Sequence, residues 1–165
     1  MKKVFSSKKT LLLSVIAYSA MTLAAQGAAL ELEESRTGVQ LECVTLKENS
    51  FTLSFIHSVS VTPVEDIYQI SKGADGDYQI LQTEERFLDH GQGLPSMNGE
   101  PDAHKFEYRD DKFVLYMNRP IGDLIVRLDS RFKNRLHTGM DVINLNQWPD
   151  FSGLRIKPVK SCHEG

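Results

Sequence analysis

Short stretches of alternating apolar and polar residues, separated by turn residues, dominate this chain after its N-terminal segment. The clearest spans residues 50–58, where Phe51, Leu53 and Phe55 fall on one face because side chains alternate sides along a strand. The best helix candidate, residues 139–148, is short. Further strands are expected at residues 40–46, 64–72, 78–87, 104–108, 112–118, 123–129, parts of 135–145, and 154–159. We therefore expect an all-β fold, a single small sandwich or barrel of about eight or nine antiparallel strands.

The N-terminal segment has the plan of a secretory signal peptide. An apolar run over residues 11–25 and a stretch of small residues follow four lysines: Lys2, Lys3, Lys8 and Lys9. The run is about 15 residues, whereas a membrane-spanning helix needs roughly 20. We expect residues 1–29 to be a signal helix, residues 30–165 to form one domain, and the protein to be periplasmic. The alternative is an inner-membrane anchor facing the periplasm, and the plausible cuts follow Ala25, Gly27 or Ala29.

The chain has two cysteines, Cys43 and Cys162. In an oxidising compartment such a pair is more often bridged than free, so we expect a disulfide between them. Closing so long a loop stabilises a fold by about 4–5 kcal/mol in the chain-entropy model. The alternative is a buried Cys43 with an unpaired Cys162.

Charge and motifs exclude several classes of function. The chain has a net charge of −3 and becomes more acidic without its leader lysines, which disfavours nucleic-acid binding. It contains no phosphate loop, no dinucleotide fingerprint and no Gly-x-Ser-x-Gly elbow, and its five histidines lack the spacing of metal ligands. We expect neither a metal nor a cofactor.

The segment around His57 is the first candidate site. A hairpin centred near Val61 would place His57 opposite Glu65, and Phe55 opposite Ile67. We expect Glu65 to accept a hydrogen bond from His57, fixing its tautomer and favouring its charged form. The pair would orient a ligand, or alternatively close the end of a core face.

The second candidate is the glycine-rich stretch within residues 89–101. Glycines permit positive φ and close backbone approach, so exposed N–H groups there can form an anion-binding nest. The alternative is a wide turn between strands. If this loop folds over the hairpin mouth, the ligand-binding residues are His57, Ser58, Glu65, Gly91, Gly93 and Pro95.

The third candidate is a basic face. Arg131, Lys133 and Arg135 recur at every second residue, with Arg127 shortly before them, so an extended chain would place them on one side. They would receive a carboxylate ligand or an acidic partner surface. Charges that protect an edge strand from aggregation are the alternative.

Several of these strings together resemble a bacterial family known as a domain of unknown function, number eighteen-fifty. They are His57-Ser58-Val59, Pro63-Val64-Glu65, the Gly-Gln-Gly-Leu-Pro string at 91–95, Asn118-Arg119-Pro120, and residues 136–139. Genes of that family are commonly found beside TRAP transporters of the TAXI type. The resemblance implies an extracytoplasmic accessory role near a carrier for small carboxylates, and no known activity.

We therefore expect a non-enzymatic module that binds a small anionic solute, or docks onto a TAXI-type TRAP transporter or its solute receptor. One alternative is a small periplasmic hydrolase with His57 as general base and Ser58 or a water as nucleophile. Another is a purely structural envelope protein.

Overall fold

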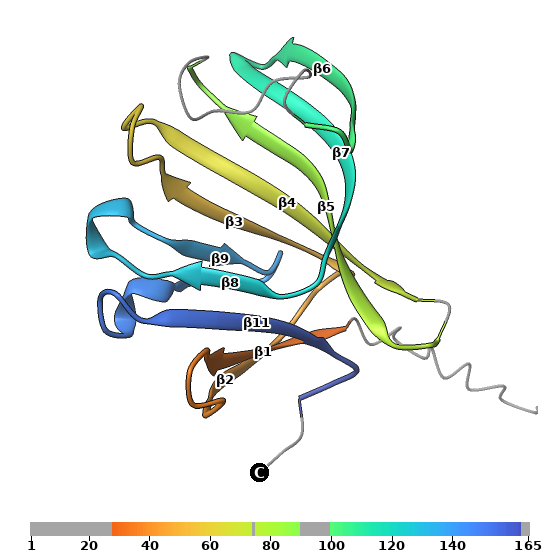
Figure 1. The fold of residues 1–165 in the computed structure, drawn as a ribbon, viewed down its shortest axis with the longest axis vertical. Helices are drawn as coiled ribbons and strands as arrows, with labels where there is room; N and C mark the ends of the chain where they lie inside the picture. The colour runs from red at the N-terminus through yellow and green to blue at the C-terminus, as the bar shows by residue number, and fades with distance from the viewer. Residues whose placement is uncertain (1–27, 74, 90–99, 163–165) are drawn as a thin grey trace, which may run out of the picture.

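The protein folds into two antiparallel β-sheets (Figure 1), as a computed structural model describes for residues 28–73, 75–89 and 100–162. The smaller sheet has the strand order β2-β1-β11-β8, and the larger has the order β10-β9-β3-β4-β5-β7-β6. The predicted all-β sandwich is confirmed. The structure has more strands than we expected.

The strand bounds are β1 Ala29–Glu34, β2 Gln40–Thr45, β3 Ser50–Ile56, β4 Pro63–Lys72, β5 Tyr78–Phe87, β6 Ala103–Arg109, β7 Lys112–Ile121, β8 Leu124–Arg127, β9 Arg135–His137, β10 Val142–Asn144 and β11 Gly153–Val159. Two 3₁₀ turns, η1 (Ser130–Phe132) and η2 (Leu145–Gln147), are the only helical elements among the described residues. The short helix candidate at 139–148 does not form an α-helix, because β10 and η2 occupy that stretch. Neither turn has the length and apolar character that crossing a bilayer requires.

Strand β1 is a strand that the sequence pattern missed. Ala29 pairs with Thr45 of β2 on one side and with Val159 of β11 on the other. The preceding Ala28 is buried, and its N–H donates to Asn49 Oδ1 at 3.0 Å. Sequence reasoning assigned these alanines to the leader because they continue its run of small apolar residues.

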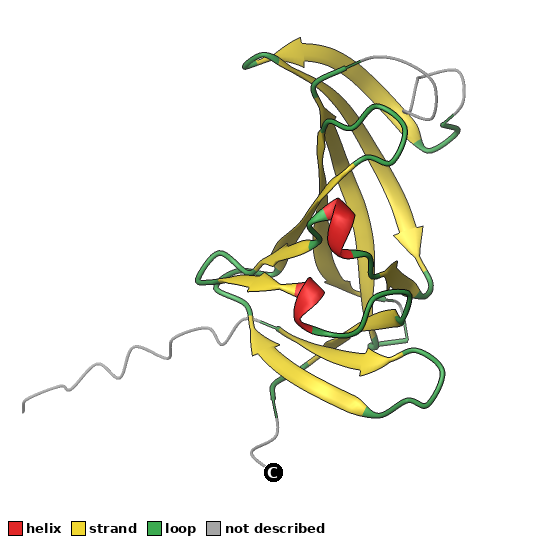
Figure 2. Cartoon of the chain, turned by 90° about the vertical axis from the view of Figure 1, so that its left-hand side faces the viewer, coloured by secondary structure: helices red, strands yellow, loops and turns green. Residues whose placement is uncertain are grey.

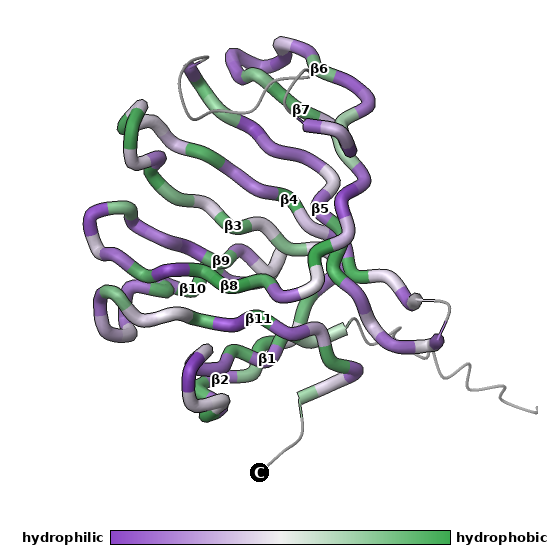
Figure 3. Tube along the Cα trace, in the orientation of Figure 1, coloured by the Kyte–Doolittle hydropathy of each residue, from purple (hydrophilic) through white to green (hydrophobic). Residues whose placement is uncertain are grey.

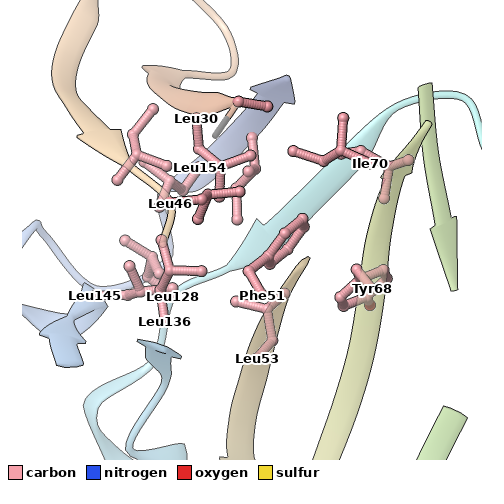
Figure 4. Packing of buried hydrophobic residues seen from close by; sticks show 14 residues of the cluster. Leu30, Leu46, Phe51, Leu53, Tyr68, Ile70, Leu128, Leu136, Leu145 and Leu154 are labelled. Atoms are coloured by element: carbon pink, nitrogen blue, oxygen red, sulfur yellow. The ribbon is translucent and has the colours of Figure 1, made fainter. Parts of the chain in front are cut away.

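The main core lies between the two sheets (Figure 4). Phe51 of β3 stacks on Tyr68 of β4 with ring centroids 5.0 Å apart, facing Leu30 of β1 and Leu154 of β11 across the sandwich. Figure 3 shows the alternation of hydrophobic and hydrophilic residues along the strands that supplies this face. Phe51 and Leu53 are buried as their alternation predicts.

The two sheets differ in extent. The end of the large sheet that carries β6 and β7 arches beyond the small sheet (Figures 1 and 2). A second apolar cluster of Val64, Phe87, Leu115 and Met117 lies on this part. The large sheet therefore contributes residues to two apolar clusters.

A disulfide joins Cys43 of β2 to Cys162, which follows β11, with the Cα atoms 5.7 Å apart. The predicted bridge is confirmed.

Candidate functional site

The β3–β4 hairpin has a different register from the predicted one. Ser54 pairs with Glu65, and Phe55 pairs with Val64. Strand β3 ends at Ile56, and a turn follows that the His57 N–H closes by donating to the Thr62 carbonyl at 2.9 Å. The predicted pairing of His57 with Glu65 is wrong by three residues. Because the register differs by an odd number of residues, Glu65 lies on the same face as Ser54 and on the face opposite to that of Phe55.

His57 finds its partner within the turn instead. The Ser60 N–H donates to His57 Nδ1 at 3.2 Å, and the Ser60 hydroxyl lies 3.1 Å from the same atom. Because Nδ1 accepts from an amide, the ring proton belongs on Nε2. Glu65 instead accepts from Lys112 Nζ at 2.8 Å. Among the described residues, Ser58 makes no hydrogen bond to His57, so the pair that the hydrolase alternative needs is not formed.

A cavity of about 370 Å³ opens beside this turn. Its walls are β3 with the turn after it, two residues of β4, strand β8, and the segment from Asp129 to Leu145. The residues that line it are Leu53, Ser54, Phe55, Ile56, His57, Ser58, Asp66, Tyr68, Leu124, Ile125, Val126, Arg127, Asp129, Phe132, Asn134, Arg135 and Leu145. A volume of this size suits a small ligand.

Four predicted site residues meet at this cavity: His57, Ser58, Arg127 and Arg135. Glu65, Arg131 and Lys133 do not line it. Gly91, Gly93 and Pro95 lie outside the described residues.

The prediction that the basic residues share one extended face is wrong. Arg131 belongs to η1, and Lys133 has a φ of 49°, so the chain turns there instead of extending. Arg131 Nη2 donates to Asp129 Oδ2 at 2.5 Å. Arg135, in β9, donates to the carbonyl of Asn134 and to Asn144 Oδ1.

Charged groups of both signs line the cavity: the guanidinium groups of Arg127 and Arg135, and the carboxyl groups of Asp66 and Asp129. Arg127 and Arg135 have no carboxylate partner within the described ranges. The carboxyl group of Asp129 stays ionised, because hydrogen bonds with Arg131 lower its pKa, and the adjacent Arg131 guanidinium offsets its charge. Burial raises the pKa of Asp66 to about 6, although hydrogen bonds from Tyr68 and Gln82 and the charge of Arg119 oppose the shift.

Asp66 also belongs to a belt of polar side chains that separates the two apolar clusters. It pairs across strands with Glu85, and it accepts hydrogen bonds from Tyr68 Oη and Gln82 Nε2, each at 3.3 Å. Burial, followed by the negative charges of Asp66 and Glu100, raises the pKa of Glu85 to about 8 against the opposing charge of Arg119. Burial and the neighbouring Asp66 also raise the pKa of Tyr68.

Sequence reasoning missed this belt, although its signal was present. Asp66 stands between Val64 and Tyr68 on the inward face of β4, and Glu85 precedes the inward Phe87 by two residues. A carboxylate at an inward position of an alternating strand marks a buried polar contact.

Within residues 28–73, 75–89 and 100–162, no group of three or more His, Cys, Asp or Glu side chains could hold a metal ion.

The family model "Domain of unknown function (DUF1850)" matches residues 51–145. The chain belongs to the DUF1850 family. Every residue that lines the cavity falls within the DUF1850 match, whereas β1, β2 and the disulfide lie outside it. No curated protein and no solved structure matches the chain.

Proposed function

We propose that this DUF1850 chain is a non-enzymatic recognition module that works outside the cytoplasm and binds a carboxylate in the cavity between β3 and β8. The observation that carries the proposal is the presence of Arg127 and Arg135 at the cavity, without carboxylate partners among the described residues. A guanidinium group binds a carboxylate through strong, charge-assisted hydrogen bonds.

The rest of the cavity suits a ligand with an apolar body. The walls present Leu53, Phe55, Leu124, Val126 and Phe132. Small-molecule sites typically combine such apolar walls with a few polar groups that fix orientation. His57 adds an Nε2–H donor, because the Ser60 amide holds its Nδ1 as an acceptor.

The proposed location and the proposed partner are each supported by other observations. The leader pattern of residues 1–29 and the Cys43–Cys162 disulfide favour an oxidising compartment, with the periplasm as the proposed location. The family resemblance supports a partner among TAXI-type TRAP transporters or their solute receptors. The bound carboxylate then belongs either to the transported solute or to the partner protein.

Titration calorimetry at low ionic strength with acetate, glutarate and 2-oxoglutarate tests the free-solute source, and a short glutamate-containing peptide tests the protein source. We expect one probe to bind, and we expect Arg127→Gln with Arg135→Gln to weaken its binding at least about tenfold, the loss of one charge-assisted hydrogen bond or more. Arg36→Gln is the matched control, because Arg36 is exposed and outside the cavity. Failure of every probe, or equal affinity in the double variant, would overturn the proposal.

A further inference from the structure

The cavity meets two strands along their edges and not across their faces. Residues 53–58 and residues 124–127 line it without interruption. Successive side chains of a strand point to opposite faces, so a cavity against one face is lined by alternate residues only. Consecutive lining residues therefore place the backbone edges of β3 and β8 at the cavity.

The edge of β3 is open at Ile56. The bond from the His57 N–H to Thr62 shows that the peptide groups of His57 face β4, so those of Ile56 face the other way. Ile56 lies opposite Pro63, which has no N–H to give. On the other side, the pairing of β3 with β9 stops at Ser54.

The edge of β8 is open as well. Among the described strands, β8 ends the order of the small sheet and pairs with β11 alone. The Leu128 N–H donates to the Ser152 carbonyl at 3.0 Å, in continuation of that pairing. By alternation, the peptide groups of Ile125 and Arg127 face away from β11.

We infer that the ligand is an extended, acidic segment of a partner protein, which adds as a strand between the edges of β3 and β8. This inference rests on the proposed carboxylate recognition and names its source. Strand addition takes its affinity from main-chain hydrogen bonds and its specificity from alternate side chains. The peptide groups of Ile56, Ile125 and Arg127 supply the hydrogen bonds.

Charge decides which kind of segment fits. Arg127 and Arg135 favour a carboxylate side chain, and Leu53, Val126 and Phe132 favour apolar residues at alternate positions. The chain's own leader carries four lysines and is therefore a poor occupant. The four residues of β8 correspond to about 13 Å of edge, enough for a segment of about four residues.

The test uses the peptide acetyl-Val-Glu-Val-Glu-Val-amide and hydrogen exchange of backbone amides by NMR. We expect the amides of Ile56, Ile125 and Arg127 to exchange rapidly in the free protein and at least about tenfold more slowly with the peptide bound. The same peptide methylated at alternate amide nitrogens should bind at least about tenfold more weakly, because methylation removes the N–H donors along one edge of the peptide strand. Absence of protection at these three amides, or equal binding of the methylated peptide, would overturn the inference.

A pair of variants at Ile125 tests independently whether its backbone N–H contributes to peptide binding. Ile125→Pro removes an N–H that faces the cavity, and proline is tolerated at such edge positions. Ile125→Ala removes the same side chain and keeps the N–H. We expect the peptide to bind about tenfold more weakly to the proline variant than to the alanine variant. Equal binding would contradict the inference, and if the proline variant fails to fold, the exchange measurement decides.

The outcomes separate the two proposals. Arginine-dependent binding of glutarate without edge protection by the peptide leaves the proposed function standing and removes the strand addition. Failure of the peptide and of every free carboxylate probe removes both proposals. Edge amides that are already protected in a dimer of the free protein would identify a second copy as the occupant and would overturn the inference.

Discussion

Val61 has a left-handed backbone conformation, which β-branched residues rarely adopt. It lies in the turn after β3 with a φ of 57°, and its side chain is 72 % exposed. A β-branched residue is strained in the left-handed region. An exposed side chain makes few contacts that could offset this strain. The turn that positions His57 and Ser58 at the cavity is therefore under local backbone strain.

We expect Val61→Gly to relieve that strain. Val59→Gly is the matched control, because Val59 is an exposed valine of the same turn whose φ is not positive. Both variants gain the same flexibility in the unfolded chain. We expect the Val61 variant to exceed the Val59 variant in unfolding free energy by roughly 1–2 kcal/mol. Urea denaturation measures the difference, and equal stabilities would show that the turn is unstrained.

The burial of Glu85, with Asp66 opposite it on the neighbouring strand, makes stability depend on pH. The pKa of Glu85 is raised from 4.5 to about 8, so the folded state binds a proton more tightly than the unfolded state does. The resulting stabilisation is fully present below pH 4.5 and is lost as the pH rises towards 8. Asp66 acts in the same direction between pH 3.8 and about 6.

Glu85→Gln should flatten this decline, because the amide stays neutral at every pH. We expect the variant to be more stable than the parent by roughly 2 kcal/mol at pH 8, with little difference near pH 4. Thermal or urea unfolding across this pH range measures the effect. Glu84→Gln makes the same chemical change at the neighbouring residue, which pairs with Arg86. If Glu85→Gln destabilises the protein at pH 8 as much as at pH 4, the carboxylate is not penalised in the fold.

At the scale of the element, β1 constrains where the predicted leader can be cut. A cut after Ala29 would remove the residue that pairs with both Thr45 and Val159. It would also remove Ala28, whose carbonyl accepts from the Leu46 N–H at 3.1 Å. If the leader is cleaved, we expect the mature chain to begin at Gln26 or Ala28. N-terminal sequencing of the exported protein tests this, and a start at Leu30 would contradict it.

Strand identity was predictable from the sequence, whereas strand pairing was not. The bounds of β5 match the prediction because a turn containing Asp75 and Gly76 precedes its run of strand-forming residues. The β3–β4 register failed because it assumed a symmetrical turn about Val61, where the chain instead adopts the left-handed region. A sequence pattern reports which side chains share a face, but the local conformation of a turn sets the offset between strands.

The predicted and the missed parts of the site differ in the same way. His57 and Ser58 reach the cavity because they follow directly from the end of β3. Arg127 and Arg135 meet there through η1, which reverses the chain between them. No periodicity in residues 127–135 signals that reversal, so the basic residues appeared to share one strand face.

At the scale of the whole molecule, the disulfide closes a loop that contains nearly the entire domain. Cys43 and Cys162 are separated by 119 residues. We expect Cys43→Ala with Cys162→Ala to lower the unfolding free energy by about 2–5 kcal/mol, chiefly because the unfolded chain gains freedom. Denaturant titrations of the parent and the variant measure the loss. A parent kept reduced should match the variant, and a stability that is indifferent to reduction would contradict the expectation.

The order of strands in the small sheet also governs when the protein can finish folding. Strand β11 is the last of the described strands along the chain, yet it lies between β1 and β8. A nascent chain that stops short of Gly153 holds its β1–β2 hairpin without a neighbour and leaves half of the sandwich uncovered. The small sheet can therefore close only after β11 has been made, so a truncation that removes β11 separates β1 from β8.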